Sequence, residues 1–310
     1  MLGLYPAADV RAAEEDVMSR VPAGTLMQRA AFGLAGECAR MLRSVVGRVS
    51  GSKVVILVGS GNNGGDALFA GARLRERGAG VRAFTLADRH HDAGARALVR
   101  AGGRISPAAS SEFSDAIAQA DLIIDGIVGI GASGPLRDPA DTAVIAANEA
   151  DALRVAVDVP SGIDADSGAV AGDAAFRADL TVTFGCAKPG LFAMPGRSWA
   201  GAVRLVDIGL AEVLPAPSRQ VLQPIDVLEY FPAPAEHDYK YSRGVVGVAA
   251  GSARYPGAAL LTIGGARYAG VGMTVVLDRG DGVARDAVRV YPDVVTTGED
   301  PRKLDRVRAW

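Results

Sequence analysis

Residues 54–66 read VVILVGSGNNGGD, and this stretch decides the fold. The β-branched run at 54–58 is typical of a buried parallel strand. Residues 67–77 then have the pattern of a helix that stops at Gly78. A glycine-rich turn between a strand and a helix leaves backbone N–H groups that suit an anion. Two carboxamides and a carboxylate in the same loop add donors, acceptors and oxygen ligands for a cation.

The same alternation of short apolar runs and helices continues along the chain. We expect further strands at 81–86, 122–125, 155–158, 178–184 and 202–208. We expect helices at 8–22, with Asp9 as N-cap, and at 25–46, 93–101, 112–119 and 140–150. This order predicts an α/β fold with a doubly wound, Rossmann-like, mostly parallel sheet.

A second segment begins after a run of prolines. Residues 1–213 form the first predicted domain, 214–238 read as a Pro-rich linker, and 239–310 start a second α/β unit. In that unit we expect strands at 244–250 and 274–277 with a helix at 257–269 between them. Some seventy residues are few for a domain built on a parallel sheet.

Composition narrows the function classes. The formal net charge of -2 gives no general attraction to nucleic acid or to an anionic membrane. No apolar stretch is long enough to span a bilayer, and the first residues lack the pattern of a secretory signal. Two distant cysteines, Cys38 and Cys186, do not indicate a disulfide framework, so we expect a reducing, cytoplasmic location.

Three loops follow predicted strands, at 59–66, 125–135 and 158–164. Because the carboxyl ends of parallel strands meet at one edge of a sheet, we expect the three loops to share a site. They would bring together a polar set beside a glycine-rich backbone: Asn62, Asn63, Asp66, Asp125, Asp158 and Ser161. This set suits a phosphate-bearing ligand with a cation nearby. The loop at 59–66 matches neither the Walker pattern nor the dinucleotide fingerprint.

Other polar residues have simpler interpretations. Asp164 and Asp166 fit a turn, Cys186 fits a structural thiol, and the arginines at 73, 75 and 77 fit a solvated helix face. His90-His91 beside Asp92 reads as a solvated loop rather than a metal site. Lys188, between turn residues, is a candidate contact for an anion.

Taken together, the motifs resemble the NAD(P)H-hydrate epimerase family, the YjeF N-terminal domain. The matching stretches are residues 58–66, Ile124-Asp125-Gly126 with the glycine loop after it, residues 157–164, and residues 181–185 with Lys188-Pro189-Gly190. The resemblance covers roughly residues 5–212. Residues 239–244, 250–252 and 255–259 resemble the start of a ribokinase-like, ADP-dependent NAD(P)H-hydrate dehydratase domain.

The resemblance implies an isomerase that interconverts the R and S hydrates of NADH or NADPH at C6. It implies a potassium ion held by Asn63, Asp125 and Ser161. The neutral oxygens of Asn63 and Ser161, together with the single charge of Asp125, suit a monovalent cation. Asp158 is then the expected acid/base group, with Asp66 as the alternative. The implied substrate-binding residues are Asn62, Asn63, Gly64, Gly65, Asp66, Gly129, Ile130, Gly131, Ala132, Ser133, Gly134, Pro135 and Asp158.

The second unit departs from the family pattern. The later glycine-rich nucleotide loop and catalytic Asp of the dehydratase have no counterpart before Trp310. We therefore do not expect this chain alone to catalyse dehydration or to bind ADP, since both require a complete dehydratase domain. Two alternatives remain: part of a bifunctional epimerase/dehydratase, or a non-catalytic dinucleotide-binding or scaffold protein. The resemblance also suggests self-association into a homo-oligomer.

Overall fold

The computed structural model describes residues 1–131, 134–172, 174–231, 233–299, 303–304 and 307–309. The chain folds as two compact units, Met1–Val221 (unit 1) and Leu222–Trp310 (unit 2). Unit 1 extends past residue 213 because a short strand near its end, β9 (Arg219–Val221), pairs antiparallel with β1 (Leu2–Leu4).

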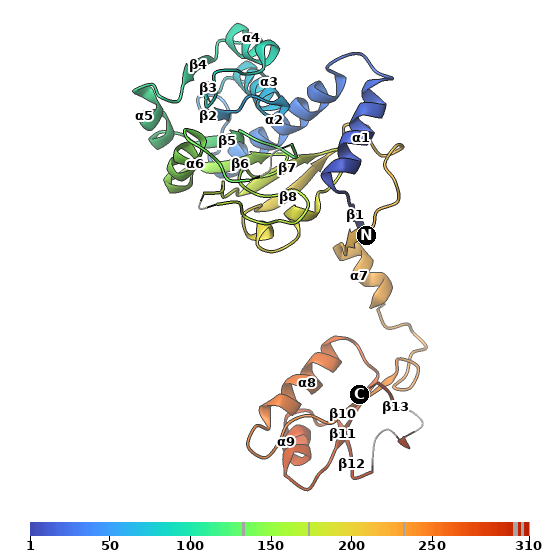
Figure 1. Cartoon of the computed structure of the whole chain (residues 1–310). Coiled ribbons are helices and arrows are strands. Elements are labelled where there is room, and N and C mark those ends of the chain that lie inside the picture. Colours follow the sequence, from blue (N-terminus) through green and yellow to red (C-terminus); the bar gives the residue numbers. More distant parts are fainter. Residues whose placement is uncertain (132–133, 173, 232, 300–302, 305–306, 310) are drawn as a thin grey trace. The chain divides into compact units, whose positions relative to one another are not determined.

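Unit 1 is built on a seven-stranded parallel sheet in the order β4-β3-β2-β5-β6-β7-β8 (Figure 1). These strands are β2 (Lys53–Val58), β3 (Gly80–Thr85), β4 (Arg104–Pro107), β5 (Leu122–Gly126), β6 (Leu153–Val157), β7 (Leu180–Phe184) and β8 (Ala202–Val206). The predicted doubly wound α/β fold is therefore confirmed. Of these seven strands, only β4, a short edge strand, is absent from the sequence prediction.

Helices cover both faces of this sheet. One layer holds α1 (Ala7–Met18), α2 (Thr25–Val45), α3 (Asn62–Glu76) and α4 (Asp92–Arg100), and the other holds α5 (Glu112–Ala118) and α6 (Ala140–Glu149). Along β2, Ile56 packs in the first layer and Leu57 in the second. This alternation explains the unbroken apolar run, since successive side chains of a strand enter opposite cores.

Two predicted details at element ends are wrong. Asp9 does not cap α1, which begins after Pro6; the N–H of Ala7 instead donates to Asp166 Oδ1 at 2.7 Å. The expected loop at 62–66 is helical, because α3 begins at Asn62 rather than at residue 67. The motif residues are thus the start of α3, next to the end of β2, and the N–H groups of residues 62–64 have no intrahelical partner.

Unit 2 contains a four-stranded parallel sheet in the order β12-β11-β10-β13. Its elements are α7 (Pro224–Tyr230), β10 (Val245–Val248), α8 (Gly257–Tyr268), β11 (Met273–Leu277), α9 (Val283–Val290), β12 (Val295–Thr297) and β13 (Val307–Ala309). The segment that reads as a linker therefore holds two regular elements, β9 and α7. Pro224 is compatible with α7 because it stands in the first turn, where no intrahelical N–H bond is needed.

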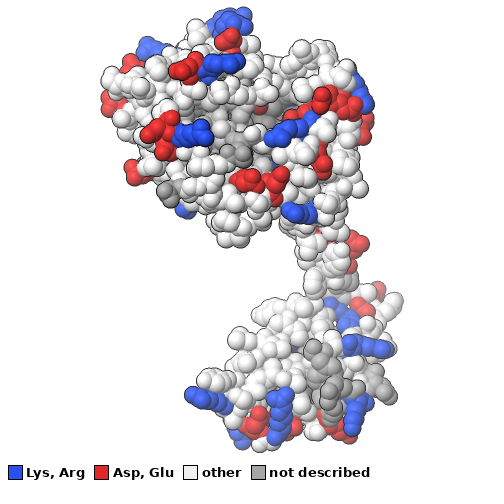
Figure 2. Space-filling model, viewed as in Figure 1, with Lys and Arg blue, Asp and Glu red and all other residues white. Residues whose placement is uncertain are grey.

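Acidic and basic side chains are intermixed on the face of the molecule that Figure 2 displays, which is consistent with the small net charge. Among the described helices, none combines the length and apolar character needed to cross a membrane.

Candidate active site

The strand order of unit 1 places a crevice at the junction of β2 and β5. From β2 the chain runs outward to β3 and β4 on one side, and from β5 it runs to β6, β7 and β8 on the other. Doubly wound sheets bind ligands at such a switch point, outside the carboxyl ends of the strands. The described residues of the three predicted loops, at 59–66, at 127–131 with 134–135, and at 158–164, follow β2, β5 and β6, so these segments meet at this edge as predicted.

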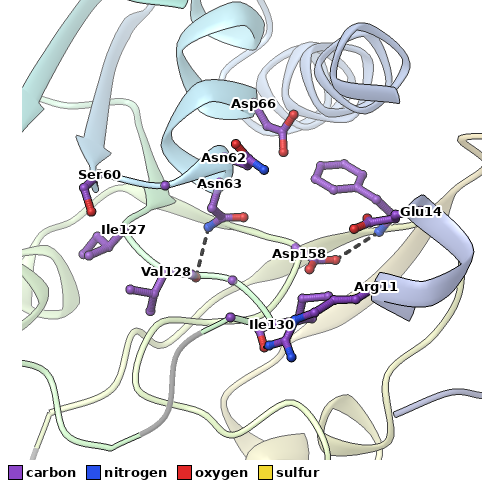
Figure 3. Close-up of a pocket in the computed structure, with 14 residues that line it drawn as sticks. Arg11, Glu14, Ser60, Asn62, Asn63, Asp66, Ile127, Val128, Ile130 and Asp158 are labelled. Atoms are coloured by element: carbon purple, nitrogen blue, oxygen red, sulfur yellow. Dashed lines mark hydrogen bonds between the residues drawn. The ribbon is translucent and has the colours of Figure 1, made fainter. Parts of the chain in front are cut away.

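A cavity of ≈ 480 Å³ lies at this edge (Figure 3). Predicted site residues that line it are Asn62, Asn63, Asp66, Gly129, Ile130, Gly131 and Asp158. Gly64, Gly65, Asp125, Ser161, Gly134 and Pro135 are described but do not line it. Ala132 and Ser133 lie outside the described residues. The predicted set does not include seven further residues of the wall: Arg11, Glu14, Ser60, Gly61, Ile127, Val128 and Phe184.

Two glycines of the motif permit close backbone approach. A Cβ on Gly59 would lie 1.8 Å from the carbonyl oxygen of Ile127, and one on Gly64 would lie 2.4 Å from that of Gly59. Both distances are far inside van der Waals contact, so these positions require glycine. The bare backbone brings the start of α3 against the loop after β5, and Asn63 Nδ2 then donates to the carbonyl of Val128 at 3.0 Å.

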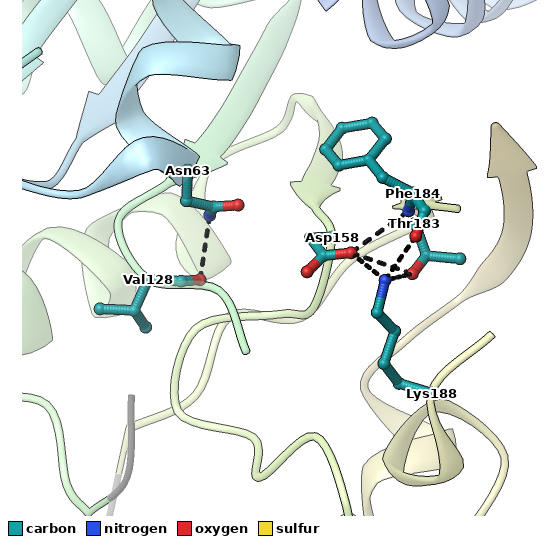
Figure 4. Close-up of polar contacts among 6 residues, drawn as sticks. All are labelled: Asn63, Val128, Asp158, Thr183, Phe184 and Lys188. Carbon is teal, nitrogen blue, oxygen red and sulfur yellow. Dashed lines mark hydrogen bonds and ion pairs between the residues drawn. The ribbon is translucent and has the colours of Figure 1, made fainter. Parts of the chain in front are cut away.

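Asp158 has a strained backbone conformation, and one of its two carboxylate oxygens accepts several hydrogen bonds. Its φ of 65° lies in the left-handed region that few non-glycine residues adopt, which is typical of functional sites. One carboxylate oxygen, Oδ1, accepts from Lys188 Nζ at 2.6 Å, Thr183 Oγ1 at 3.1 Å and the N–H of Phe184 at 3.2 Å (Figure 4). The side chain nevertheless lines the cavity, so its second oxygen, Oδ2, is the one left for a ligand.

Lys188 does not reach a separate anion site. Its side chain is 1% exposed, and its ammonium donates to Asp158 Oδ1, Thr183 Oγ1 and the carbonyl of Phe184. The anion that Lys188 contacts is therefore a carboxylate of the chain itself. In a buried pair of this kind, each charge compensates the other, so the loss of one partner is costly.

Asp125 and Ser161 form a second buried cluster, beside the loop that follows β5. Asp125 accepts from Ser161 Oγ at 2.7 Å, from the N–H of Ser161 at 2.8 Å and from the N–H of Ile127 at 3.2 Å. Ser161 Oγ accepts in turn from the N–H of Val128 at 3.2 Å. Burial raises the pKa of Asp125 to about 6, although the hydrogen bonds from Ser161 and Ile127 oppose that shift.

Two more carboxyl groups face the cavity near Asp158. Burial raises the pKa of Asp66 well above its ordinary value, and the nearby charges of Asp158 and Glu14 raise it further. Asp66 Oδ1 is buried without a hydrogen-bond partner among the described residues. Burial, followed by the charge of Asp158, also raises the pKa of Glu14. The site thus combines an ion-paired carboxylate, Asp158, with a carboxyl that favours its protonated form, Asp66.

The wall that the sequence prediction missed comes in part from α1. Arg11 Nη2 donates to the carbonyl of Ile130 at 2.7 Å, which ties this helix to the glycine loop after β5. Glu14, one turn further along, enters the cavity (Figure 3). Neither residue stands in a motif, and an acidic or basic residue on an amphipathic helix gives no signal in a single sequence.

The remaining sequence candidates have structural roles. Burial raises the pKa of Cys186 to about 11, and the thiol is free and buried, as expected of a structural cysteine. His91 caps α4, its Nδ1 accepting from the N–H of Gly94 at 3.1 Å. Asp164 bonds within its own turn. The arginines at 73, 75 and 77 each donate a hydrogen bond to an oxygen of another segment of unit 1, so they are not merely solvated.

Among the described residues, no group of three or more His, Cys, Asp or Glu side chains could hold a metal ion.

Comparison with known proteins gives consistent results. Residues 23–190 match the protein family described as YjeF-related protein N-terminus. The chain is 44% identical over 316 residues to a Mycobacterium leprae protein named bifunctional NAD(P)H-hydrate repair enzyme Nnr, covering 99% of this chain and 61% of that protein. The chain therefore spans about three fifths of such relatives.

Shorter relatives match unit 1. A Clavibacter sepedonicus protein named NAD(P)H-hydrate epimerase is 44% identical over 216 residues, which cover 66% of this chain and 90% of that protein. The crystal structure of the yeast protein ynu0 has a TM-score of 0.56 at 20% sequence identity, covering 66% of this chain and 87% of the yeast chain. That similarity supports the fold of unit 1.

Proposed function

The chain belongs to the family of YjeF-related protein N-termini, and on that premise we propose that its first domain, residues 1–213, is an NAD(P)H-hydrate epimerase. Its substrates would be the R and S forms of hydrated NADH or NADPH. The observation that carries the proposal is the pairing of Asp158 and Asp66 in one cavity. The first forms an ion pair with Lys188, whereas the second is buried, has one oxygen without a hydrogen-bond partner among the described residues, and has a raised pKa.

Epimerisation at C6 needs both a proton donor and a proton acceptor. In one route, neutral Asp66 protonates the C6 hydroxyl, the C6–O bond breaks and water leaves as the N1 lone pair forms a C6=N1 double bond. Water then adds to the opposite face and gives its proton to Asp158.

In the other route, Asp158 removes the hydroxyl proton, the C6–N1 bond breaks to an aldehyde, and N1 takes a proton from Asp66. Closure on the other face completes the inversion.

We assign the rest of the predicted substrate set to binding of the dinucleotide. Of the predicted residues 62–66, those at 62–64 supply backbone N–H groups without an intrahelical partner, together with the positive end of the helix dipole. In the predicted glycine loop from Gly129 to Pro135, Gly129 and Gly131 line the cavity and have no side chain that would keep a pyrophosphate away from the backbone. The bond from Arg11 to Ile130 supports this role, because it holds the loop in place.

Potassium is the cofactor that we propose, held by Asn63, Asp125 and Ser161. The chemistry of the donor set fits it: Asp125 is fully buried, and every hydrogen bond to it among the described residues comes from a neutral donor. A monovalent cation would neutralise this charge without the multiple carboxylates that a divalent ion requires. The contribution of this chain is to fix Asp125 and Ser161 between the loops after β5 and β6.

For the rest of the chain, we propose that residues 214–238 connect the two domains. Residues 239–310 would correspond to the beginning of an ADP-dependent dehydratase domain. The support is the alignment to relatives named as bifunctional repair enzymes, which covers nearly all of this chain. ADP would bind only to a complete domain. The free thiols fit a reducing cytoplasm, and a homo-oligomer is the assembly that the family suggests.

A stereochemical assay tests the proposed function. Purified R hydrate of NADH is incubated with the protein, with and without ADP or ATP, and the epimers are separated by chromatography. Conversion to an R/S mixture without nucleotide supports the epimerase. Nucleotide-dependent return of NADH would instead indicate the bifunctional enzyme, and an unchanged R hydrate would indicate a non-catalytic binding protein.

A further inference from the structure

A second cavity, of ≈ 590 Å³, adjoins the first within unit 1. The two share four wall residues: Glu14, Asn62, Asp66 and Phe184. Beyond this shared wall, the second cavity is surrounded by α2, α3 and the start of α4, so it extends away from Asp158. The two cavities therefore adjoin at a wall that includes Asp66, one of the two carboxyl groups in the proposed chemistry.

The second cavity has the lining of a site for a flat ring. Met27, Phe69 and Ile208 contribute apolar walls, and the rings of Phe69 and His91 meet edge to face with centroids 5.7 Å apart. Sites for small molecules are mostly apolar, with a few polar groups that fix orientation. Aromatic side chains at such a site stack on nucleobases.

His91 supplies a polar group of defined tautomer. Its Nδ1 accepts from the N–H of Gly94 at 3.1 Å, so the proton of the neutral ring is on Nε2. A ring N–H of this kind donates to an acceptor nitrogen such as those of adenine. His91 thus caps α4 with one nitrogen and retains the other as a donor.

Gly65 packs against two residues that line the second cavity, His91 and Met27. A Cβ at Gly65 would lie 2.8 Å from His91 Cγ and 3.0 Å from Met27 Cε. The absence of a side chain there lets both residues lie directly against α3. This close packing accounts for Gly65, a motif glycine that does not line the cavity around Asp158.

We propose that the second cavity binds the adenosine half of the dinucleotide substrate, with adenine stacked on Phe69 and beside His91. The inference rests on the proposed epimerase function, because a dinucleotide has two ring systems joined by a pyrophosphate. Asn62, at the N-terminus of α3, lines both cavities and marks where the pyrophosphate crosses between them. The hydrated nicotinamide then lies toward Asp158, and the adenosine lies toward α4.

Kinetics on two substrates of different length test this assignment. Epimerisation of hydrated NADH and of hydrated reduced nicotinamide mononucleotide, which lacks the adenosine, is measured for the wild type, Phe69→Ala and Met27→Trp. We expect kcat/KM for hydrated NADH to fall at least about tenfold in both variants, as loss of base stacking predicts. The loss should fall on the dinucleotide and not on the mononucleotide. Phe32→Ala, an exposed phenylalanine on α2 outside both cavities, is the matched control.

Direct binding separates failure of this inference from failure of the proposed function. Titration calorimetry of the full chain with 5′-AMP requires no turnover. We expect the wild type and Phe32→Ala to bind AMP and both cavity variants to lose that binding, with melting temperatures confirming that each variant is folded. Such a result supports the adenosine site even if neither hydrate is epimerised. Equal losses on both substrates, or no AMP binding to the wild type, would overturn it.

Discussion

Lys188 Nζ lies 2.6 Å from Asp158 Oδ1, and this pair is buried at the end of β6 next to the cavity. The lysine fixes one carboxylate oxygen and leaves the other to face the cavity. It therefore acts as a positioning residue for Asp158. Because both charges are withdrawn from water, removal of either one leaves its partner uncompensated.

Replacement of Asp158 should abolish epimerisation. We expect Asp158→Ala to lower kcat by at least about a hundredfold, since it removes the proton acceptor. The unpaired Lys188 should also cost about 3–5 kcal/mol of stability. The double variant Asp158→Ala/Lys188→Met should recover most of that stability without recovering activity. As a control, Asp115→Ala, which replaces an exposed acidic residue on α5, should change neither activity nor stability. Unchanged turnover in Asp158→Ala would refute the assignment.

Asp66 should impose an upper pH limit on activity. As a proton donor, it must be neutral, so kcat should fall as pH rises through its elevated pKa. We expect Asp66→Asn to lose most activity at every pH and to lack this limb of the profile. A pH–rate profile that is identical in shape for the two proteins would contradict the role.

The same substitution should stabilise the fold at alkaline pH. Because the pKa of Asp66 is raised in the folded state, its contribution to stability is fully present below its unfolded pKa and is lost as pH rises through the folded one. Asn cannot ionise, so we expect Asp66→Asn to gain about 0.5–2 kcal/mol in free energy of unfolding at high pH. Urea unfolding at acidic and alkaline pH measures the difference, which should vanish in acid.

Potassium should stabilise the wild type through Asp125. At a concentration tenfold above its dissociation constant, the ion should add about 1.4 kcal/mol, or a few degrees in Tm. Asp125→Asn should show equal Tm values in potassium chloride and choline chloride, because it lacks the charge that the ion neutralises. An equal increase in both proteins would indicate a general salt effect and count against the site.

Two glycines in one turn should respond differently to alanine. Gly59→Ala places a Cβ 1.8 Å from the carbonyl oxygen of Ile127, so the loops after β2 and β5 must separate. We expect a loss of about 2 kcal/mol or more. Gly61→Ala meets no atom within 4 Å and has an ordinary backbone conformation, so its stability should stay within about 0.5 kcal/mol of the wild type. Chemical denaturation compares the two.

Much of unit 1 could be predicted because its local signals agree with its tertiary structure. The apolar run at 54–58 and the carboxylates after β5 and β6 identified the strands and the edge where ligands bind. The start of α3 was missed because Asn and Gly are poor helix formers. Here, the fit of Gly64 against Gly59 outweighs that preference, a contact that no local window of sequence reveals.

Long-range partners account for the other misses. Glu14 and Arg11 reach the cavity only because α1 packs beside it, and nothing in their own segment marks them. In the proline-rich region, Pro224 suggested a linker, but it lies within a capping box between Gln223 and Asp226 that begins α7. A single proline is compatible with either structure, so the capping residues were the more informative signal.

The pairing of Leu2–Leu4 with Arg219–Val221 has a practical consequence for dissecting the protein. It brings the first residues of the chain beside the last residues of unit 1. A gene fragment that ends at residue 213 would leave the first strand with an exposed edge, whereas one that ends at residue 221 retains its partner. Because the two ends are neighbours, a short peptide could join them, and the chain could be reopened at a surface turn. Circular permutants of this kind would show whether the order of the segments matters for folding.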